Sequence, residues 1–231
     1  MSTANAIIIG TQPCHSCSPR LSAEALAKVE RERRPLPAEA HNHARLPVPR
    51  RIPNEFYPTK PEAVRALLSV ESFDCSIWEP ACGEGAIAKV LTASGHEVVS
   101  TDRYAYGFGQ TSIDFLAEPA PRARHIVTNP PYGKGLADAF MVKALTLTRE
   151  TGGKVALLLN LASLCYPRRT ALWQQMPPAR IYGIDGIVCW PSNRYGPAPE
   201  AFTRHRYCWV VWTPEHQGAP RFGWLSANDF R

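Results

Sequence analysis

The chain has 231 residues, 45% of them hydrophobic, so it can bury one sizeable core. Lys and Arg outnumber Asp and Glu by 26 to 20, and the net charge of +6 suits a polyanionic partner. No apolar stretch reaches the roughly 18 uncharged residues of a membrane span, and the N-terminal apolar run has no basic lead, so we expect a soluble, unexported protein. The seven cysteines are odd in number and scattered, which favours the cytoplasm over a disulfide scaffold. Three of them lie in apolar segments and are expected to be buried: Cys165, Cys189 and Cys208.

Residues 1–51 are expected to form a basic, Pro-rich and poorly packed arm. Nine of the 22 prolines occur by Pro61, and up to Pro53 there are eight Lys and Arg against four Asp and Glu, so four of the six net charges lie there. One short helix is predicted, from Ser22 to Arg33. No metal is expected, because the candidate zinc ligands of the arm do not have a usual zinc spacing: Cys14, Cys17, His41 and His43.

From residue 52 to residue 231 apolar strands alternate with amphipathic helices, which predicts one domain built on a parallel sheet. Thr59 and Glu62 have the form of a capping box at the start of a helix from Lys60 to about Ser69. A long loop insertion, 191–205, is rich in Pro, Arg and aromatic residues and is expected to be either functional or disordered. The predicted strands are Ser76–Trp78, Glu97–Thr101, His125–Thr128, Lys154–Leu161, Ile181–Trp190 and Arg206–Trp212.

The first strand runs into a glycine turn, Glu79-Pro80-Ala81-Cys82-Gly83-Glu84-Gly85, that leads into a helix. Such a turn lets backbone amides approach a ligand closely, and an acidic residue that ends the next strand, here Asp102, can bind two ribose hydroxyls. The turn lacks the dinucleotide pattern Gly-x-Gly-x-x-Gly and carries a carboxylate at Glu79, so a pyrophosphate is disfavoured. We expect instead a nucleoside with a cationic amino-acid tail.

The segment Asn129-Pro130-Pro131-Tyr132 directly follows a predicted strand, so it lies at the carboxyl edge of the sheet, where open α/β folds bind ligands. The two prolines fix the chain and leave the Asn129 amide and the Pro130 carbonyl facing outward. Their oxygens can accept hydrogen bonds from an aromatic amine, whose lone pair then turns toward an electrophilic methyl group. Tyr132 is expected to stack on a base extruded from a duplex.

The order of these motifs resembles that of the S-adenosylmethionine-dependent amino-methyltransferases of the Asn-Pro-Pro-Tyr type that modify adenine N6 in DNA, including small phage and prophage forms. The resemblance runs from about Phe56 to Trp212. It implies a Rossmann-like class I methyltransferase fold, with a mostly parallel central sheet of about seven strands and helices on both faces. It also implies an S-adenosylmethionine site formed by Phe56, Tyr57, Thr59, Glu79, Pro80, Cys82, Gly83, Gly85, Asp102, Asp114 and Phe115.

DNA is the partner that the resemblance implies. Basic and aromatic side chains on loops after the predicted strands are the candidate contacts, because cations neutralise phosphates and aromatic rings stack on bases. They are Lys134, Arg168, Arg169, Arg194, Tyr195, Phe202, Arg204 and Arg206. Many relatives carry a separate target-recognition domain for which this chain is short, so sequence recognition is expected to be short or lax.

Two other kinds of function are open at this point. The Asn-Pro-Pro-Tyr turn can bind any planar amine or amide, so an RNA adenine methyltransferase and a methyltransferase acting on protein glutamine are alternatives. A module that binds the cofactor or DNA without turnover is an alternative of another class. The basic loops favour nucleic acid over protein, and the intact turn favours an enzyme.

Overall fold

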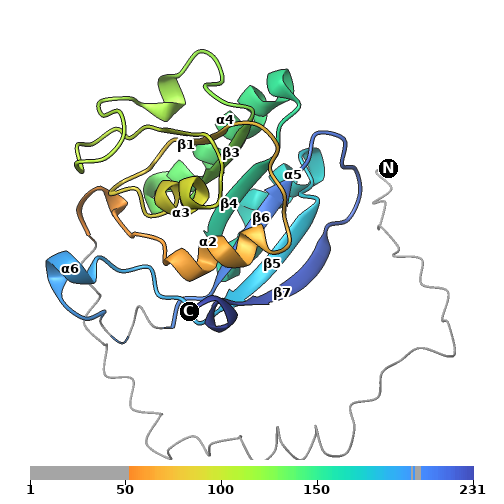
Figure 1. Cartoon of the computed structure of the whole chain (residues 1–231). Coiled ribbons are helices and arrows are strands. Elements are labelled where there is room, and N and C mark those ends of the chain that lie inside the picture. The colour runs from red at the N-terminus through yellow and green to blue at the C-terminus, as the bar shows by residue number, and fades with distance from the viewer. Residues whose placement is uncertain (1–51, 199, 201–203) are drawn as a thin grey trace, which may run out of the picture. The chain divides into compact units, whose positions relative to one another are not determined.

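The computed structural model describes residues 52–198, 200 and 204–231 (Figure 1). The predicted arm, with its helix and its candidate zinc ligands, lies outside the described residues, and so does Phe202. The described part contains one sheet with the strand order β2-β1-β3-β4-β6-β5-β7. Its strands are β1 Ile77–Glu79, β2 Val98–Ser100, β3 His125–Thr128, β4 Val155–Asn160, β5 Arg180–Asp185, β6 Tyr207–Trp212 and β7 Arg221–Ser226.

In this sheet β6 alone runs against its neighbours. It pairs antiparallel with β4 on one side and with β5 on the other, whereas every other neighbouring pair is parallel. Parallel neighbours need long crossover connections, which helices supply. The prediction of a mostly parallel sheet of about seven strands is confirmed.

Helices cover both faces of the sheet, as predicted (Figure 1). Leu67 of α2 and Leu91 of α3 share one core cluster with Trp209 of β6. Phe140 of α4 shares the cluster on the other face with Leu157 of β4. The helices are α2 Pro61–Leu68, α3 Ala88–Ala93, α4 Leu136–Thr151, α5 Pro167–Gln175 and α6 Ser192–Tyr195, and the short 3-10 segments are η1 Pro53–Glu55, η2 Phe115–Ala117, η3 Gly133–Gly135, η4 Leu161–Cys165 and η5 Ala227–Phe230.

The start of α2 differs from the predicted capping box. Lys60 is the N-cap residue, and no side chain caps the helix. The buried Thr59 hydroxyl instead accepts a hydrogen bond from Asn129 Nδ2 at 3.1 Å. Pro61 has no backbone N–H, so the first turn has one donor fewer to satisfy. The predicted cap is wrong because Thr59 bonds to another part of the molecule.

The second half of the sheet departs from the predicted pattern in two places. β5 ends at Asp185 instead of Trp190, because Gly186 turns the chain with a φ of +70°. β7 was not among the predicted strands. It is an edge strand that leaves Phe222 and Trp224 exposed, so it lacks the buried apolar run that identified the other strands.

The cysteines in the described part are all free thiols. Cys189 and Cys208 are buried, as predicted, but the prediction is wrong for Cys165, which is exposed at the end of η4. In the part of the chain that the structure describes, no helix combines the length and apolar character needed to cross a membrane.

A partly buried network of ion pairs and hydrogen bonds joins the segment after α2 to the starts of β4 and β5. The Glu71 carboxylate accepts hydrogen bonds from Lys154 Nζ at 3.0 Å, from Arg180 Nη2 at 2.9 Å and from the Tyr182 hydroxyl at 3.1 Å. Burial opposes ionisation of Glu71, but the hydrogen bonds from Arg180 and Lys154 outweigh it and hold the pKa of this carboxyl below its usual value. The network fixes the amino ends of these strands.

Candidate functional site

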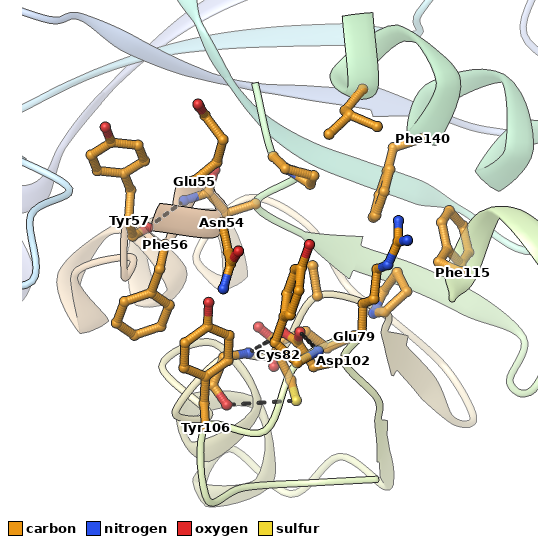
Figure 2. A pocket seen from close by; sticks show the side chains of 18 of the residues that line it. Asn54, Glu55, Phe56, Tyr57, Glu79, Cys82, Asp102, Tyr106, Phe115 and Phe140 are labelled. Atoms are coloured by element: carbon orange, nitrogen blue, oxygen red, sulfur yellow. Dashed lines mark hydrogen bonds between the residues drawn. The ribbon is translucent and has the colours of Figure 1, made fainter. Parts of the chain in front are cut away.

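The carboxyl ends of β1, β2 and β3 border a cavity of about 360 Å³ (Figure 2). Its walls come from the segment before α2, the turn after β1, the loop after β2 and the start of α4. This volume suits a small organic ligand. The residues expected from the sequence that line it are Phe56, Tyr57, Thr59, Glu79, Pro80, Cys82, Gly83, Asp102, Asp114, Phe115, Asn129, Pro131 and Lys134.

The turn after β1 adopts backbone conformations that favour glycine. Gly83 and Gly85 have φ values of +54° and +79°. A Cβ on Gly83 would lie 2.7 Å from Phe56 Cε2, and one on Gly85 would lie 2.6 Å from Phe108 Cε1. Gly83 lines the cavity, whereas Gly85 is not among the described lining residues and lies against Phe108.

Two buried carboxyl groups line the cavity. Glu79 accepts a hydrogen bond from the Ala88 amide at 2.8 Å. Asp102 accepts hydrogen bonds from the Gly83 and Tyr104 amides, both at 2.8 Å. Burial raises the pKa of Asp102, and burial together with the nearby Asp102 charge raises the pKa of Glu79 well above its usual value. A positively charged ligand would favour the ionised forms of both groups, so the cavity suits a cation.

Cys82 lines the cavity as a neutral thiol. Burial, with the charges of Glu79 and Asp102, raises its pKa to about 12. A thiol is a strong nucleophile only as the thiolate, so Cys82 does not suit covalent catalysis at neutral pH.

An aromatic stack packs on the glycine turn. The rings of Phe56 and Tyr106 lie 4.4 Å apart at an angle of 17°. The guanidinium carbon of Arg194 in α6 lies 5.0 Å from the Phe56 ring centre, and Arg194 forms an ion pair with Glu84 of the turn. Tyr106 was missed in the sequence, although the aromatic run after Asp102 was a visible signal: Tyr104, Tyr106 and Phe108.

Asp114 and Phe115 occupy another part of the wall. Asp114 forms an ion pair with Arg103 at 3.5 Å and caps η2, where its carboxylate accepts a hydrogen bond from the Leu116 amide at 3.1 Å. Phe115 is buried with its ring centre 4.8 Å from that of Phe140, and Figure 2 shows the two rings side by side. These rings give this part of the cavity an apolar surface.

The side-chain amide of Asn129 has a defined orientation. Its Nδ2 donates hydrogen bonds to the Tyr57 carbonyl at 2.9 Å and to Thr59 Oγ1 at 3.1 Å, and the carbonyl, which can only accept, identifies the nitrogen. Its Oδ1 accepts a hydrogen bond from the Tyr132 hydroxyl at 2.5 Å. An amide nitrogen has two donor protons and an amide oxygen two acceptor sites. Asn129 therefore offers a ligand one acceptor site and no donor.

The side chain of Tyr132 makes its contacts within the protein. Its hydroxyl contacts Asn129 and, at 2.9 Å, the Leu158 carbonyl, while its ring packs against both core clusters. Of the described residues, neither Tyr132 nor Pro130 belongs to the cavity lining, whereas Pro131 does. The stacking of Tyr132 on a base, expected from the sequence, remains a prediction.

The candidate nucleic-acid contacts near α4 and α5 differ in exposure. Lys134 is exposed at the cavity. Arg168 and Arg169 both pair with Asp138, at 2.6 and 2.5 Å, but the Arg168 side chain is 57% exposed and that of Arg169 only 3%. Arg169 also donates hydrogen bonds to Ser163. Its buried position does not suit a phosphate contact, so this expectation from the sequence is wrong.

The remaining candidates lie at the surface near α6 and before β6. Arg194 is exposed but paired with Glu84, and Tyr195 is 50% exposed. Arg204 pairs with Glu200 at 2.8 Å, and Arg206 donates a hydrogen bond to the His205 carbonyl at 3.2 Å.

Among residues 52–198, 200 and 204–231, no group of three His, Cys, Asp or Glu side chains is arranged to hold a metal ion.

Comparison with known proteins identifies the fold. No protein-family model and no curated protein matches the chain. A structure from Listeria monocytogenes, described as a class I S-adenosylmethionine-dependent methyltransferase, is similar with a TM-score of 0.53 and 13% identity, over 75% of this chain and 67% of that chain. The M protein of the type I restriction enzyme EcoKI is similar with a TM-score of 0.51 and 12% identity, over 73% of this chain and 46% of that chain. The match thus spans less than half of the M protein, and the fold is that of the class I methyltransferases.

Proposed function

We propose that this chain transfers a methyl group from S-adenosylmethionine to the N6 amino group of adenine in DNA. The observation that carries the proposal is the hydrogen-bonding state of Asn129, which has one acceptor site free beside the cavity and no free donor. An exocyclic amine presents an N–H donor to such an oxygen. A ring carbonyl is itself an acceptor, so it cannot form a hydrogen bond with the oxygen of Asn129.

The residues of the cavity fit S-adenosylmethionine, which carries positive charge on its sulfur and its amino group. Glu79 and Asp102 have raised pKa values because they are buried, and a cationic ligand favours their ionised forms. Asp102 follows β2, the position from which a carboxylate accepts hydrogen bonds from ribose hydroxyls. Gly83 leaves open the space that a Cβ would fill, and Phe115 gives an apolar wall for the adenine ring.

The reaction follows from where the amine is held. When bound, S-adenosylmethionine supplies an electrophilic methyl group on a positively charged sulfur. The lone pair of an aromatic amine is delocalised into the ring, and acceptance of an N–H group by Asn129 Oδ1 turns that lone pair out of the ring plane. With S-adenosylmethionine held by the cavity, the N–C bond would form as the methyl–sulfur bond breaks, the electron pair would go to sulfur, and the nitrogen would then lose a proton to water. Positioning and electrostatics account for the rate.

Exposed basic side chains support a polyanionic substrate. Lys134 is exposed at the cavity, and Arg168, Tyr195 and Arg204 are exposed on segments that follow β4 and β5. Cations in such positions neutralise phosphates and an exposed ring can stack on a base. The likeness to the M protein of a restriction enzyme favours DNA over RNA and protein as the substrate.

The test is transfer of a labelled methyl group from S-adenosylmethionine to duplex DNA, single-stranded DNA, RNA and a protein extract in parallel, followed by nucleoside analysis. N6-methyladenine in DNA is the expected product. Label in RNA alone or on protein glutamine alone would overturn the choice of substrate. No label in any of the four would overturn the activity and favour a binding module.

The same assay separates Asn129 from the cofactor site. Asn129→Ala is expected to abolish methyl transfer and to leave the affinity for S-adenosylmethionine nearly unchanged, because the two carboxyl groups lie on other segments. Asn228→Ala, at an exposed asparagine near the end of the chain, is the matched control. A loss of cofactor affinity of about tenfold or more for Asn129→Ala would contradict this division of roles.

A further inference from the structure

The hydroxyl of Tyr132 lies between two oxygens that both act as acceptors. It is 2.5 Å from Asn129 Oδ1 and 2.9 Å from the Leu158 carbonyl oxygen. A tyrosine hydroxyl has one proton, and burial keeps that proton in place by raising the pKa of Tyr132 well above its usual value. Two oxygens 2.5 Å apart repel each other unless a proton lies between them, so the hydroxyl donates to Asn129.

The amide of Asn129 is consequently held at three points. The Tyr57 carbonyl and the Thr59 hydroxyl hold its nitrogen, and Tyr132 holds its oxygen. The terminal torsion of an asparagine side chain is broad when nothing restrains it. Three contacts fix the plane of the amide, and with it the direction of the one lone pair of Oδ1 that stays free for a ligand.

The ring of Tyr132 is engaged elsewhere. It packs against both hydrophobic clusters. Tyr132 is not among the described residues that line the cavity. This packing of the ring fixes the position of the hydroxyl that it carries.

We propose that Tyr132 is a positioning residue that acts through its hydroxyl on Asn129. The proposal rests on the proposed function, because it describes how the oxygen that binds the amine is held. Loss of the hydroxyl leaves the cofactor and polymer contacts in place and misaligns the reacting nitrogen. The change therefore affects turnover more than binding.

The test compares Tyr132→Phe with the wild-type chain. This change removes the hydroxyl and keeps the ring, so the turnover number kcat for methyl transfer is expected to fall by about tenfold, the loss of one hydrogen bond. The KM for DNA and the Kd for S-adenosylmethionine are expected to stay within about twofold. Thr59→Val, which removes one of the other two contacts of the amide, is expected to change kcat in the same direction.

Tyr182→Phe is the matched control. Its hydroxyl also makes a hydrogen bond in the interior, to Glu71 at 3.1 Å, but it belongs to the network at the amino ends of the strands. It is expected to leave kcat unchanged, so a fall in kcat for Tyr132→Phe alone separates positioning from a general loss of packing.

A second readout does not depend on activity. The side-chain NH2 group of Asn129, identified in nitrogen-15 NMR spectra by its loss in Asn129→Asp, is expected to exchange with solvent about tenfold faster in Tyr132→Phe than in the wild type and in Tyr182→Phe. Unchanged exchange would show that the hydroxyl does not hold the amide.

The outcomes separate this proposal from the proposed function. A wild-type chain that methylates none of the four substrates overturns the proposed function, while the exchange rates still decide whether Tyr132 holds Asn129. An active wild type with full kcat in Tyr132→Phe overturns the positioning role. A raised KM for DNA with unchanged kcat in Tyr132→Phe overturns it as well, in favour of contact with the substrate.

Discussion

The carboxyl group of Glu79 is 1% exposed and receives its hydrogen bond from the Ala88 amide. Because burial raises its pKa, the folded chain binds a proton at Glu79 more tightly than the unfolded chain does. The free energy of unfolding contributed by this group therefore decreases as the pH rises from the usual carboxyl range through the raised pKa. Asp102 contributes with the same sign, so the cavity lowers stability near neutral pH until a cation occupies it.

Glu79→Gln tests directly whether the buried carboxyl groups lower the stability near neutral pH. In the absence of ligand the variant is expected to be more stable than the wild type near neutral pH, with a smaller decrease of stability as the pH rises, because one of the two buried ionisations is gone. It is also expected to bind S-adenosylmethionine about tenfold or more weakly, since a hydrogen bond to a charged group contributes about 1.5–3 kcal/mol. Urea unfolding at several pH values and calorimetric titration measure the two effects. Glu97→Gln, at an exposed carboxyl, is the control, and the same pH dependence in Glu79→Gln and the wild type would refute the argument.

Arg168 and Arg169 form a matched pair because both bind Asp138. Arg169→Ala is expected to lower the free energy of unfolding by about 3 kcal/mol, because it removes a buried partner of a carboxylate. Arg168→Ala is expected to lower it by less than about 1 kcal/mol, since its ion pair is exposed, and to weaken DNA binding. Urea unfolding and a DNA titration compare the two variants. Equal losses of stability would show that burial does not separate their roles.

The residues that meet at one edge of the sheet could be predicted from the sequence. Glu79, Asp102 and Asn129 each end or follow a parallel strand, and parallel strands bring their carboxyl ends together. The burial of Arg169 could not be predicted, because nothing in a single sequence indicates that Asp138 lies beside it. The position of Tyr132 depended in the same way on contacts with strand β4.

At the scale of elements, the turn after β1 has a conformation that only glycine adopts easily, and Gly152 at the end of α4 gives a comparison. Gly83 and Gly152 have φ values of +54° and +62°, but a Cβ on Gly152 would meet no described atom within 4 Å. Alanine at either position is expected to lower stability by about 1–2 kcal/mol through backbone strain. Gly83→Ala alone is expected to weaken cofactor binding, because its Cβ displaces Phe56. Thermal unfolding and cofactor titration are measured for the two alanine variants. Equal cofactor affinities in the two would contradict the role of the turn after β1 in binding the cofactor.

The predicted elements were most accurate where burial imposes a simple pattern. β4 and β6 consist largely of buried apolar residues, which the sequence displays directly, and the short strands β1 and β3 are buried along their whole length. The edge strand β7 carries exposed aromatic residues and was missed, and the end of β5 depends on the turn at Gly186. The cap of α2 was wrong because a motif of local residues cannot show that Thr59 bonds to Asn129, which is 70 positions away.

For the whole molecule, periodicity indicated the sheet and its layers, whereas the strand order and the reversal of β6 come from pairings between distant segments. Such pairings follow from the packing of the complete core, and local pattern does not encode them. The boundary between the arm and the domain, placed after residue 51, remains a prediction.

Removal of residues 1–51 tests that boundary. Ile52 is kept because it packs with Phe56 and Trp190. The arm has eight Lys and Arg and four Asp and Glu, a difference of four positive charges, so a folded product is expected to show a DNA affinity less dependent on salt, with a slope reduced by as much as about 3.6 in a logarithmic plot. Thermal unfolding and DNA titration at several salt concentrations measure this. An insoluble product would show that the arm belongs to the core, and an unchanged slope that it does not contact DNA.

All described residues that line the cavity lie between Asn54 and Phe140, while most of the exposed candidates for contact with the polymer follow β4. The chain thus divides into a first part that lines the cavity and a second part that carries most of the proposed contacts with the polymer. Under the proposed function, changes at the exposed positions of the second part would alter the polymer contacts and leave the residues that line the cavity as they are. A lineage with this arrangement could acquire a new target by exchanging one stretch of its gene.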